Sequence, residues 1–213
     1  IFCLVRTSSE GKPQMGISFL LIDMKSPGVS VRPIVTLDGG VEVNEVWFDN
    51  VEVPAENLIG PENGGFMGIM RNFNGERLGM AQQAAAYARV CFEDALDWAQ
   101  QREVFGRPLI RNQAIRHKLA DMATRIAAAR ALTGECVTRY LKGEDAPSLA
   151  AMAKNTGTDM CSWVCDQAVQ IHGGYGYMRE VTVERLYRDA RLYPIGGGTR
   201  EIMNEIISKM EGY

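Results

Sequence analysis

The sequence lacks the features that mark several special classes of protein. Its longest apolar runs, such as Phe19–Ile22 and Ala84–Ala88, fall far short of the roughly 20 residues that span a bilayer, so we expect no membrane-spanning helix. It also has no excess of basic residues, because 23 Lys and Arg stand against 26 Asp and Glu, which gives a formal net charge of −3. Proteins that bind nucleic acid or an anionic membrane surface need such an excess. Neither is therefore an expected partner.

Cysteine and histidine are also scarce. The two histidines, His117 and His172, and the five cysteines show no CxxC or HExxH spacing, so no metal site is expected. Cys161, Cys165 and His172 share one side of a predicted helix, and we interpret them as core residues. An odd number of scattered cysteines indicates free thiols in a reducing compartment rather than disulfides. The chain also lacks an arrangement of nucleophile, base and orienting group of the Ser-His-Asp kind.

The chain begins neither with Met nor with a signal-peptide pattern, but with the strand-like run Ile1–Val5. We therefore expect that its first residue is not the first residue of the gene product. The absence of a targeting segment then carries no information about the compartment.

What the sequence does contain is typical of a globular chain with two parts. Hydrophobic residues make up 46% and charged residues 23% of it, which is enough to bury a core. Up to Pro54, runs rich in β-branched and aromatic residues alternate with turn residues, which predicts strands. After a boundary near residues 55 to 65, apolar residues recur at the helical period of 3.6. The expected strands are 1–6, 17–23, 29–35 and 41–48, and the expected helices are 66–101, 112–141, 147–171, 181–192 and a last one from 199.

The first of these helices is long enough for a helix bundle, since it measures about 50 Å at 1.5 Å per residue. Pro108 prevents its simple continuation. The sequence thus predicts a strand-rich module followed by a bundle. The apolar stripe of the first helix is expected at Met67, Met70, Phe73, Leu78, Ala81, Ala85, Ala88, Phe92, Leu96 and Ala99.

Two glycine clusters, Gly173–Gly176 and Gly196–Gly198, each precede a predicted helix. Backbone N–H groups in such segments can approach a ligand closely, and Thr199 is a good N-cap for the last helix. Neither cluster fits the dinucleotide fingerprint or the P-loop, so a tight turn between helices is the favoured interpretation of each cluster taken alone. Glu76 within the first helix is, on residue statistics alone, a solvent-exposed side chain.

Several motifs together resemble the acyl-CoA dehydrogenase family, in an order and spacing that fit over essentially the whole chain. These motifs are Phe48–Gly60, Arg102–Leu109 followed by Gln113, Gln170–Tyr177, Tyr187–Arg191 and Ile195–Thr199.

The resemblance implies an α+β fold. Residues 1–63 are then the C-terminal part of an incomplete, antiparallel middle β domain, and residues 64–213 are the C-terminal four-helix-bundle domain. In this family FAD lies between these two domains, and a neighbouring subunit completes its binding site. The resemblance therefore implies a homo-oligomer, either a dimer or a tetramer. The N-terminal helices and the β segment that contacts the flavin ring lie outside the chain, so the chain alone is expected to be inactive. The compartment would be the cytoplasm in a bacterium and the mitochondrial matrix in a eukaryote.

The resemblance also implies which residues hold FAD. Arg102 matches the arginine that faces the pyrophosphate, where a guanidinium group can bind two phosphate oxygens. Gln113 matches a polar contact to the adenosine side. The other implied contacts are Gln170, Gly173 and Gly174 along the dinucleotide, with Thr199 and Glu201, the latter standing where relatives commonly have Gln.

The family removes an α-proton from an acyl-CoA thioester with a carboxylate, while the β-hydrogen leaves as hydride to FAD, and the electrons pass to an electron-transferring flavoprotein. Many members carry this carboxylate in a Tyr-Glu-Gly-Thr loop, where this chain has Gly196–Thr199. The isovaleryl-CoA and long-chain branches carry it on the long helix instead, in a Glu-Arg-Leu segment that Glu76–Leu78 matches. The resemblance thus implies Glu76 as the base, Gly197 as its small partner and N–H donor to the thioester oxygen, and Arg77 as a substrate contact.

Two other interpretations stay open at this point. One is a relative that works as a flavin-dependent oxidase or monooxygenase, although Glu76 counts against it. The other is a non-catalytic module whose helices form an assembly interface. The length of the acyl group is not readable, and the position of Glu76 favours branched or long groups by analogy alone.

Overall fold

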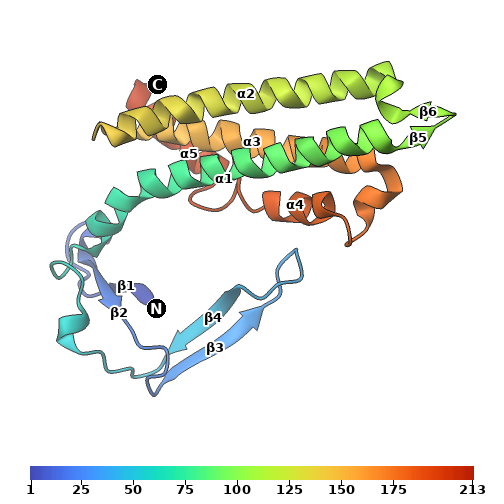
Figure 1. Ribbon diagram of the computed structural model, residues 1–213. Coiled ribbons are helices and arrows are strands. Elements are labelled where there is room, and N and C mark those ends of the chain that lie inside the picture. The colour runs from blue at the N-terminus through green and yellow to red at the C-terminus, as the bar shows by residue number, and fades with distance from the viewer. The chain divides into compact units, whose positions relative to one another are not determined.

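The computed structural model describes residues 1–213, which divide into two compact units, Ile1–Phe73 and Asn74–Tyr213. Helix α1, Gly65–Gln101, begins within the first unit and continues through the second (Figure 1). None of the helices combines the length and the apolar character that a membrane span requires.

The first unit contains two antiparallel strand pairs. Strand β1, Phe2–Arg6, pairs with β2, Ile17–Leu21, and β3, Val29–Ile34, pairs with β4, Val43–Phe48. All four lie within one or two residues of their predicted positions. Two short 3-10 helices, η1 at Pro13–Gly16 and η2 at Ala55–Asn57, complete this unit before α1.

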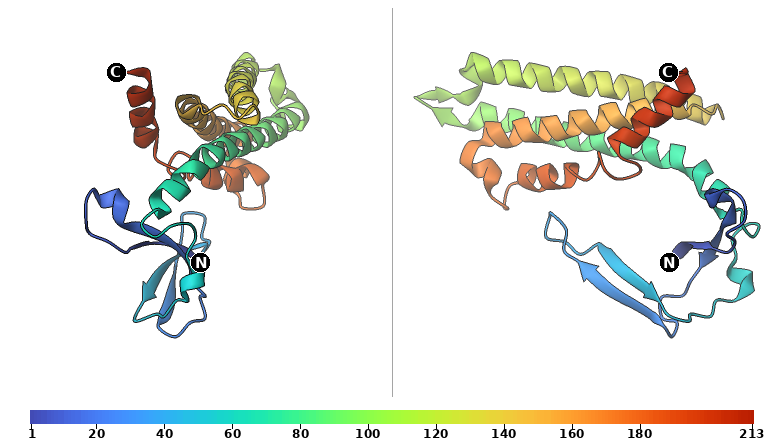
Figure 2. Two further views of the ribbon diagram at one scale, coloured as in Figure 1. Left: turned by 90° about the vertical axis from the view of Figure 1, so that its left-hand side faces the viewer. Right: turned by 180° about the vertical axis from the view of Figure 1, so that it is seen from behind.

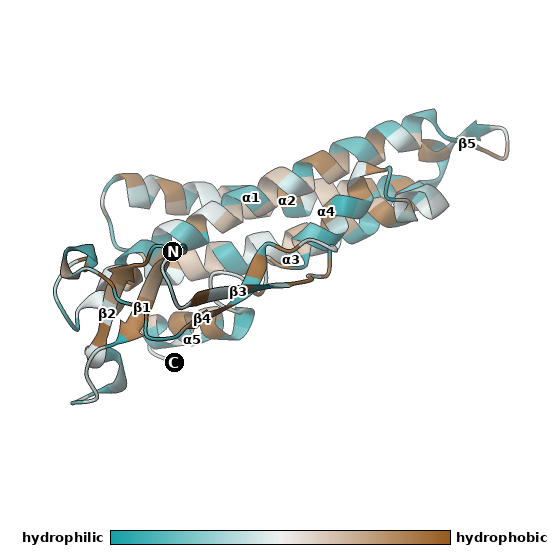
Figure 3. Ribbon diagram, turned by 90° about the horizontal axis from the view of Figure 1, so that it is seen from below, coloured by the Kyte–Doolittle hydropathy of each residue, from teal (hydrophilic) through white to brown (hydrophobic).

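The strands expose many apolar side chains, and much of β1, β2 and β3 has hydrophobic colouring in Figure 3. An isolated two-stranded sheet is marginal in water, and apolar surface of this extent normally has a cover. The exposed apolar residues include Phe2, Leu4, Leu21, Val31, Ile34, Val43, Trp47 and Phe48.

The second unit is a bundle in which three long helices, α1, α2 and α3, lie side by side (Figures 1 and 2). Two shorter helices, α4 and α5, pack on α3. A small hairpin of β5 and β6 joins α1 to α2, where the sequence indicated a break at Pro108. The bounds are β5 Glu103–Val104, β6 Arg107–Pro108, η3 Leu109–Arg111, α2 Gln113–Leu141, α3 Pro147–His172, η4 Gly173–Tyr177, α4 Thr182–Ala190 and α5 Arg200–Glu211.

Small residues allow the bundle helices to approach closely. On α3, a Cβ added to Gly157 would lie 3.3 Å from the backbone oxygen of Ala81 on α1. Near the middle of the bundle, Cys91 of α1 and Cys165 of α3 are both buried, with 3.4 Å between their sulfur atoms. All five cysteines are free thiols. The fully buried positions on α1 are Ala81, Ala84, Ala88, Cys91, Ala95 and Ala99.

Candidate active site

The predicted base segment of α1 meets the glycine loop, which we define as Gly196–Thr199 between α4 and α5. Arg77 is 5% exposed, and its Nε donates to the carbonyl oxygen of Gly197 over 3.5 Å. Its Nη1 donates to Asn74 Oδ1 over 3.2 Å, which holds the guanidinium group against its own helix. The structure therefore places Arg77 beside Gly197, and Glu76 is the preceding residue of α1.

Charge and burial differ sharply between these two neighbours on α1. Burial lowers the pKa of Arg77, and the negative charge of Glu76 acts in the opposite direction. Glu76 itself is exposed. The Glu76 carboxylate is thus open to solvent one residue before a buried guanidinium group.

Two glycines of the loop adopt a left-handed backbone. Gly197 has φ of 63° and Gly198 has φ of 109°, a region that favours glycine. A Cβ on Gly197 would lie 2.5 Å from Sδ of Met80. Met80 follows Glu76 by four residues, so the two side chains share one face of α1. The space that a side chain at Gly197 would take is therefore filled by Met80.

Lys154 of α3 binds the glycine loop from inside the bundle, and the sequence analysis did not identify it. Its side chain is 0% exposed, and its Nζ donates to the carbonyl oxygens of Pro194, over 3.4 Å, and of Gly198. Burial lowers the pKa of Lys154, the charge of Arg77 lowers it further, and that of Glu201 raises it. The only indication of its position in the sequence is that it is the single lysine among the many small and apolar residues of α3.

The start of α5 continues from the loop. Thr199 is its N-cap, and the hydroxyl oxygen accepts a bond from the backbone N–H of Ile202 over 3.4 Å. Hydrogen bonds from its own backbone N–H and from the Thr199 hydroxyl lower the pKa of the exposed Glu201 carboxyl. Thr199 and Glu201 thus lie in the same region as Gly197 and Arg77.

The remaining predicted cofactor residues lie at one end of the bundle. There the ring of Trp98 on α1 stacks on that of His172 on α3, with 5.1 Å between centroids. Lys118 near the start of α2 donates to Gln167 near the end of α3. These contacts bring together the helix ends that carry Arg102, Gln113, Gln170, Gly173 and Gly174.

The chemistry of this second group suits a dinucleotide. Arg102 is exposed, and none of the ion pairs of the chain includes it, so its guanidinium group is available to a phosphate. A Cβ on Gly173 or Gly174 would meet no atom within 4 Å, which leaves an open backbone surface for a flat ligand. Gln113 and Gln170 are exposed, and their side-chain amides can donate and accept hydrogen bonds.

The two groups of predicted residues are far apart along the bundle. Glu76 and Arg102 are separated by 26 residues of α1, since 102 − 76 = 26, and this corresponds to about 39 Å of helix. The structure therefore does not bring Arg102 to Glu76, and one copy of the chain offers two separate half-sites.

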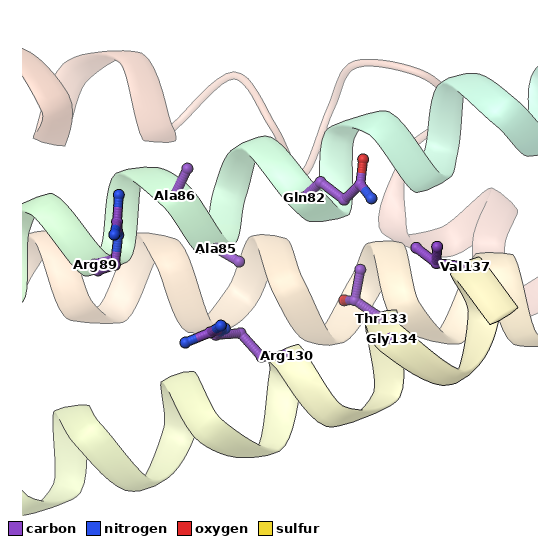
Figure 4. Close-up of a pocket in the computed structure, with 8 residues that line it drawn as sticks. All are labelled: Gln82, Ala85, Ala86, Arg89, Arg130, Thr133, Gly134 and Val137. Atoms are coloured by element: carbon purple, nitrogen blue, oxygen red, sulfur yellow. The ribbon is translucent and has the colours of Figure 1, made fainter.

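A further hollow lies between α1 and α2, with a volume of about 330 Å³ (Figure 4). Arg89 and Arg130 provide its charged lining, and it contains none of the predicted site residues. It therefore lies apart from the candidate active site. The lining residues are Gln82, Ala85, Ala86, Arg89, Arg130, Thr133, Gly134 and Val137.

Comparisons with known proteins agree with the resemblance in the motifs. The sequence model "Acyl-CoA dehydrogenase, C-terminal domain" matches residues 63–211. An acyl-CoA dehydrogenase of Bacillus subtilis is 44% identical over 196 residues, which cover 91% of this chain and 52% of that protein. The caffeyl-CoA reductase-Etf complex subunit CarC of Acetobacterium woodii is 37% identical over 201 residues, covering 93% of this chain and 53% of that protein.

Solved structures give the same result. The chain is similar to the crystal structure of a probable acyl-CoA dehydrogenase from Mycobacterium abscessus, with a TM-score of 0.92 and 47% sequence identity. The superposition covers 99% of this chain and 57% of that chain. The predicted fold class is therefore confirmed. The chain spans about half the length of the curated relatives it matches. Motifs, fold and relatives lead to one conclusion: this chain belongs to the acyl-CoA dehydrogenase family.

Proposed function

We propose that the full-length protein containing this chain is an FAD-dependent acyl-CoA dehydrogenase. It converts an acyl-CoA thioester to the α,β-unsaturated thioester. The observation that supports this most strongly is the bond between Arg77 and the carbonyl oxygen of Gly197. This bond joins the Glu-Arg-Leu segment of α1 to the glycine loop, which has no carboxylate of its own.

Glu76 is the base in this proposal, and it takes the α-proton of the thioester. An α-proton next to a thioester is weakly acidic, so negative charge that develops on the carbonyl oxygen needs a hydrogen-bond donor. The backbone N–H of Gly197 serves as this donor, while Arg77 holds the loop and contributes positive charge near the substrate. A bound FAD would supply the acceptor for the β-hydrogen, which leaves as hydride.

The second half-site supplies the cofactor contacts. Arg102 binds the pyrophosphate, Gln113 the adenosine side, and the backbone of Gln170, Gly173 and Gly174 lies along the dinucleotide. Thr199 and Glu201 contact the cofactor from the glycine loop.

The separation of the two half-sites by about 39 Å of helix supports a homo-oligomer. In a dimer or tetramer, Arg102 of one copy completes the cofactor site next to Glu76 of another. Association of two copies brings the half-site around Glu76 of one copy next to the half-site around Arg102 of the other. A single copy cannot bring its own two half-sites together.

We also propose the domain assignment 1–63 and 64–213, with residues 1–63 forming part of a larger β domain. The apolar side chains exposed on β1 to β4 support this, because further strands would cover them. An electron-transferring flavoprotein is the proposed electron acceptor. The relative from Acetobacterium woodii, whose name includes an Etf complex, supports this choice.

The test is an assay of the purified full-length protein with a panel of acyl-CoA thioesters of different length and branching. Bleaching of the flavin absorbance by at least one thioester, with turnover when an artificial dye accepts the electrons, is the expected result. A protein without bound flavin, or a flavin that no thioester of the panel reduces, would exclude the proposal. Rapid consumption of O₂ in place of the dye would favour an oxidase.

A further inference from the structure

Lys154 is the largest fully buried side chain of the molecule. Its ammonium group lies against two carbonyl oxygens, those of Pro194 just before the glycine loop and of Gly198 within it. Both acceptors are neutral, and none of the ion pairs of the chain includes Lys154. The acceptors of the ammonium group therefore belong to one short segment, and the negative charge of Glu201 is the nearby countercharge.

A cation at this position is costly for stability. Removal of an ammonium group from water is unfavourable, and the nearby positive charge of Arg77 adds repulsion. An unbranched apolar residue such as Met would fill the same space without either cost. Lys154 therefore points to a role beyond packing.

The bonds to the glycine loop determine which way its peptide groups face. Arg77 binds the carbonyl oxygen of Gly197, and Lys154 binds that of Gly198. All peptide bonds here are trans, so the N–H of each peptide group points away from its C=O. The N–H groups of Gly198 and Thr199 thus face away from the two cations. No backbone hydrogen bond of the loop uses the N–H groups of Gly197, Gly198 or Thr199.

We propose that Lys154 is a positioning residue which, together with Arg77, fixes the two peptide groups that follow Gly197 and so holds the loop in the conformation that presents the N–H of Gly197 to the substrate. Three successive glycines have the greatest backbone freedom of any tripeptide, so the loop has no strong conformational preference of its own. Bonds from α1 through Arg77 and from α3 through Lys154 select one conformation. This inference rests on the proposed function for its catalytic consequence, whereas the conformational part stands without it.

The test compares the wild-type full-length protein with Lys154→Met, Lys154→Arg and a control, Lys209→Met. Lys209 is an exposed lysine of α5 paired with Glu205, so this control removes one positive charge without touching the loop. The first measurement is amide hydrogen exchange of peptides covering residues 194–202. The second is the rate at which saturating acyl-CoA reduces the flavin in a single turnover.

We expect Lys154→Met to retain most of its FAD, because the contacts of the second half-site are unchanged and only those of Thr199 and Glu201 adjoin the altered loop. Exchange of the amides of Ile195 and Gly196, which follow Pro194 and are hydrogen-bonded to the carbonyl oxygen of Leu192, should rise at least about 10-fold. Flavin reduction should slow by about 10-fold or more, since misaligned donors stabilise the developing oxyanion poorly. Lys154→Arg keeps a cation at this position. Both its exchange rate and its flavin-reduction rate should therefore lie close to those of the wild type. Lys209→Met should match the wild type. If Lys154→Met does not fold, Lys154→Gln replaces it, because its shorter neutral amide cannot bind both carbonyl groups.

The two measurements separate the possible failures. Wild-type exchange in the Lys154→Met loop would overturn the inference, whatever the activity. Faster exchange with an unchanged reduction rate would overturn its catalytic part. A wild-type flavin that no thioester reduces would refute the proposed function, and the exchange result would then still decide whether Lys154 fixes the loop.

Discussion

Substitution of Gly197 by Ala perturbs the glycine loop in two separable ways. The residue has φ of 63°, where a side chain is strained, and a Cβ there would lie 2.5 Å from Sδ of Met80. The first effect belongs to the backbone and is present whatever surrounds the loop. The second depends on one flexible side chain of α1, so it can be removed by a second substitution.

The structure allows a magnitude for each effect. A non-glycine residue in the left-handed region costs about 1 to 2 kcal/mol. Insertion of a methyl group into packed surroundings costs about 1 to 3 kcal/mol, and the low end is expected because the end of a Met side chain can move. Gly197→Ala should therefore lower the free energy of unfolding by about 2 to 4 kcal/mol.

A double-mutant cycle with Met80→Ala isolates the contact. In the double variant the methyl group that Gly197→Ala introduces enters the space that Met80 leaves, so the combined cost should be smaller than the sum of the single costs by about 1 to 2 kcal/mol. Urea unfolding of the full-length protein, compared at constant m value, measures each free energy. Gly79→Ala on the same helix is the control, because its Cβ would meet no atom within 4 Å, and it should be neutral or stabilising. Strictly additive costs, or a harmless Gly197→Ala, would refute the described packing.

Three further predictions follow from other parts of the chain. Arg102→Ala should weaken FAD retention by about 1.5 to 3 kcal/mol, measured as flavin content after dialysis, and unchanged content would exclude the pyrophosphate contact. Arg188 lowers the pKa of Glu184 below its usual 4.5, so this pair stabilises the fold above pH 4.5 and the contribution is lost as the pH falls through the lowered value. Urea unfolding should therefore show Glu184→Gln to be less stable than the wild type by about 0.5 kcal/mol at neutral pH and equal to it in strong acid. Four buried thiols should resist a thiol reagent in the native protein and react with it after unfolding. Rapid reaction of these thiols in the native protein would contradict their burial. These thiols belong to Cys91, Cys136, Cys161 and Cys165.

The secondary structure was largely predictable because its signals are local. Alternation and turn residues marked the four longer strands, and Pro147 and Thr199 marked the starts of two helices within one residue. The hairpin of β5 and β6 was not predicted, since two-residue strands show no period. Its tip at Phe105 and Gly106 has positive φ values of 52° and 76°, which the sequence does not reveal for Phe.

The buried stripe of α1 was only partly predictable. Ala81, Ala88 and Ala99 are buried as expected. Met67 and Met70, at the start of the expected stripe, are exposed, so that part of the prediction was wrong. Ala85, Phe92 and Leu96 pack against the core as expected, but they are only partly buried. The physical reason is close helix packing, which selects small residues for the centre of the stripe and leaves larger ones at its edges. The centre is occupied instead by Ala84, Cys91 and Ala95.

The candidate site shows a similar limit. Family motifs pointed to Glu76 and Gly197, and the contact of Arg77 with Gly197 supports placing them together. The role of Met80 depends on one side-chain conformation and on the backbone of Gly197, neither of which a motif specifies. Lys154 was missed because a lysine is rarely buried, so residue statistics assign it to the surface.

The central claim is that Glu76 is the base, and Glu76→Gln tests it most directly, because Gln keeps the size and hydrogen bonding of Glu but cannot accept the α-proton. The measurement is the single-turnover rate of flavin reduction by an acyl-CoA that reduces the wild type. Glu93→Gln, an exposed change on the same helix, serves as the control and should reduce its flavin at the wild-type rate. We predict that Glu76→Gln binds FAD normally and reduces it about 10² to 10⁴ times more slowly. A Glu76→Gln protein that is reduced at the wild-type rate would contradict the account.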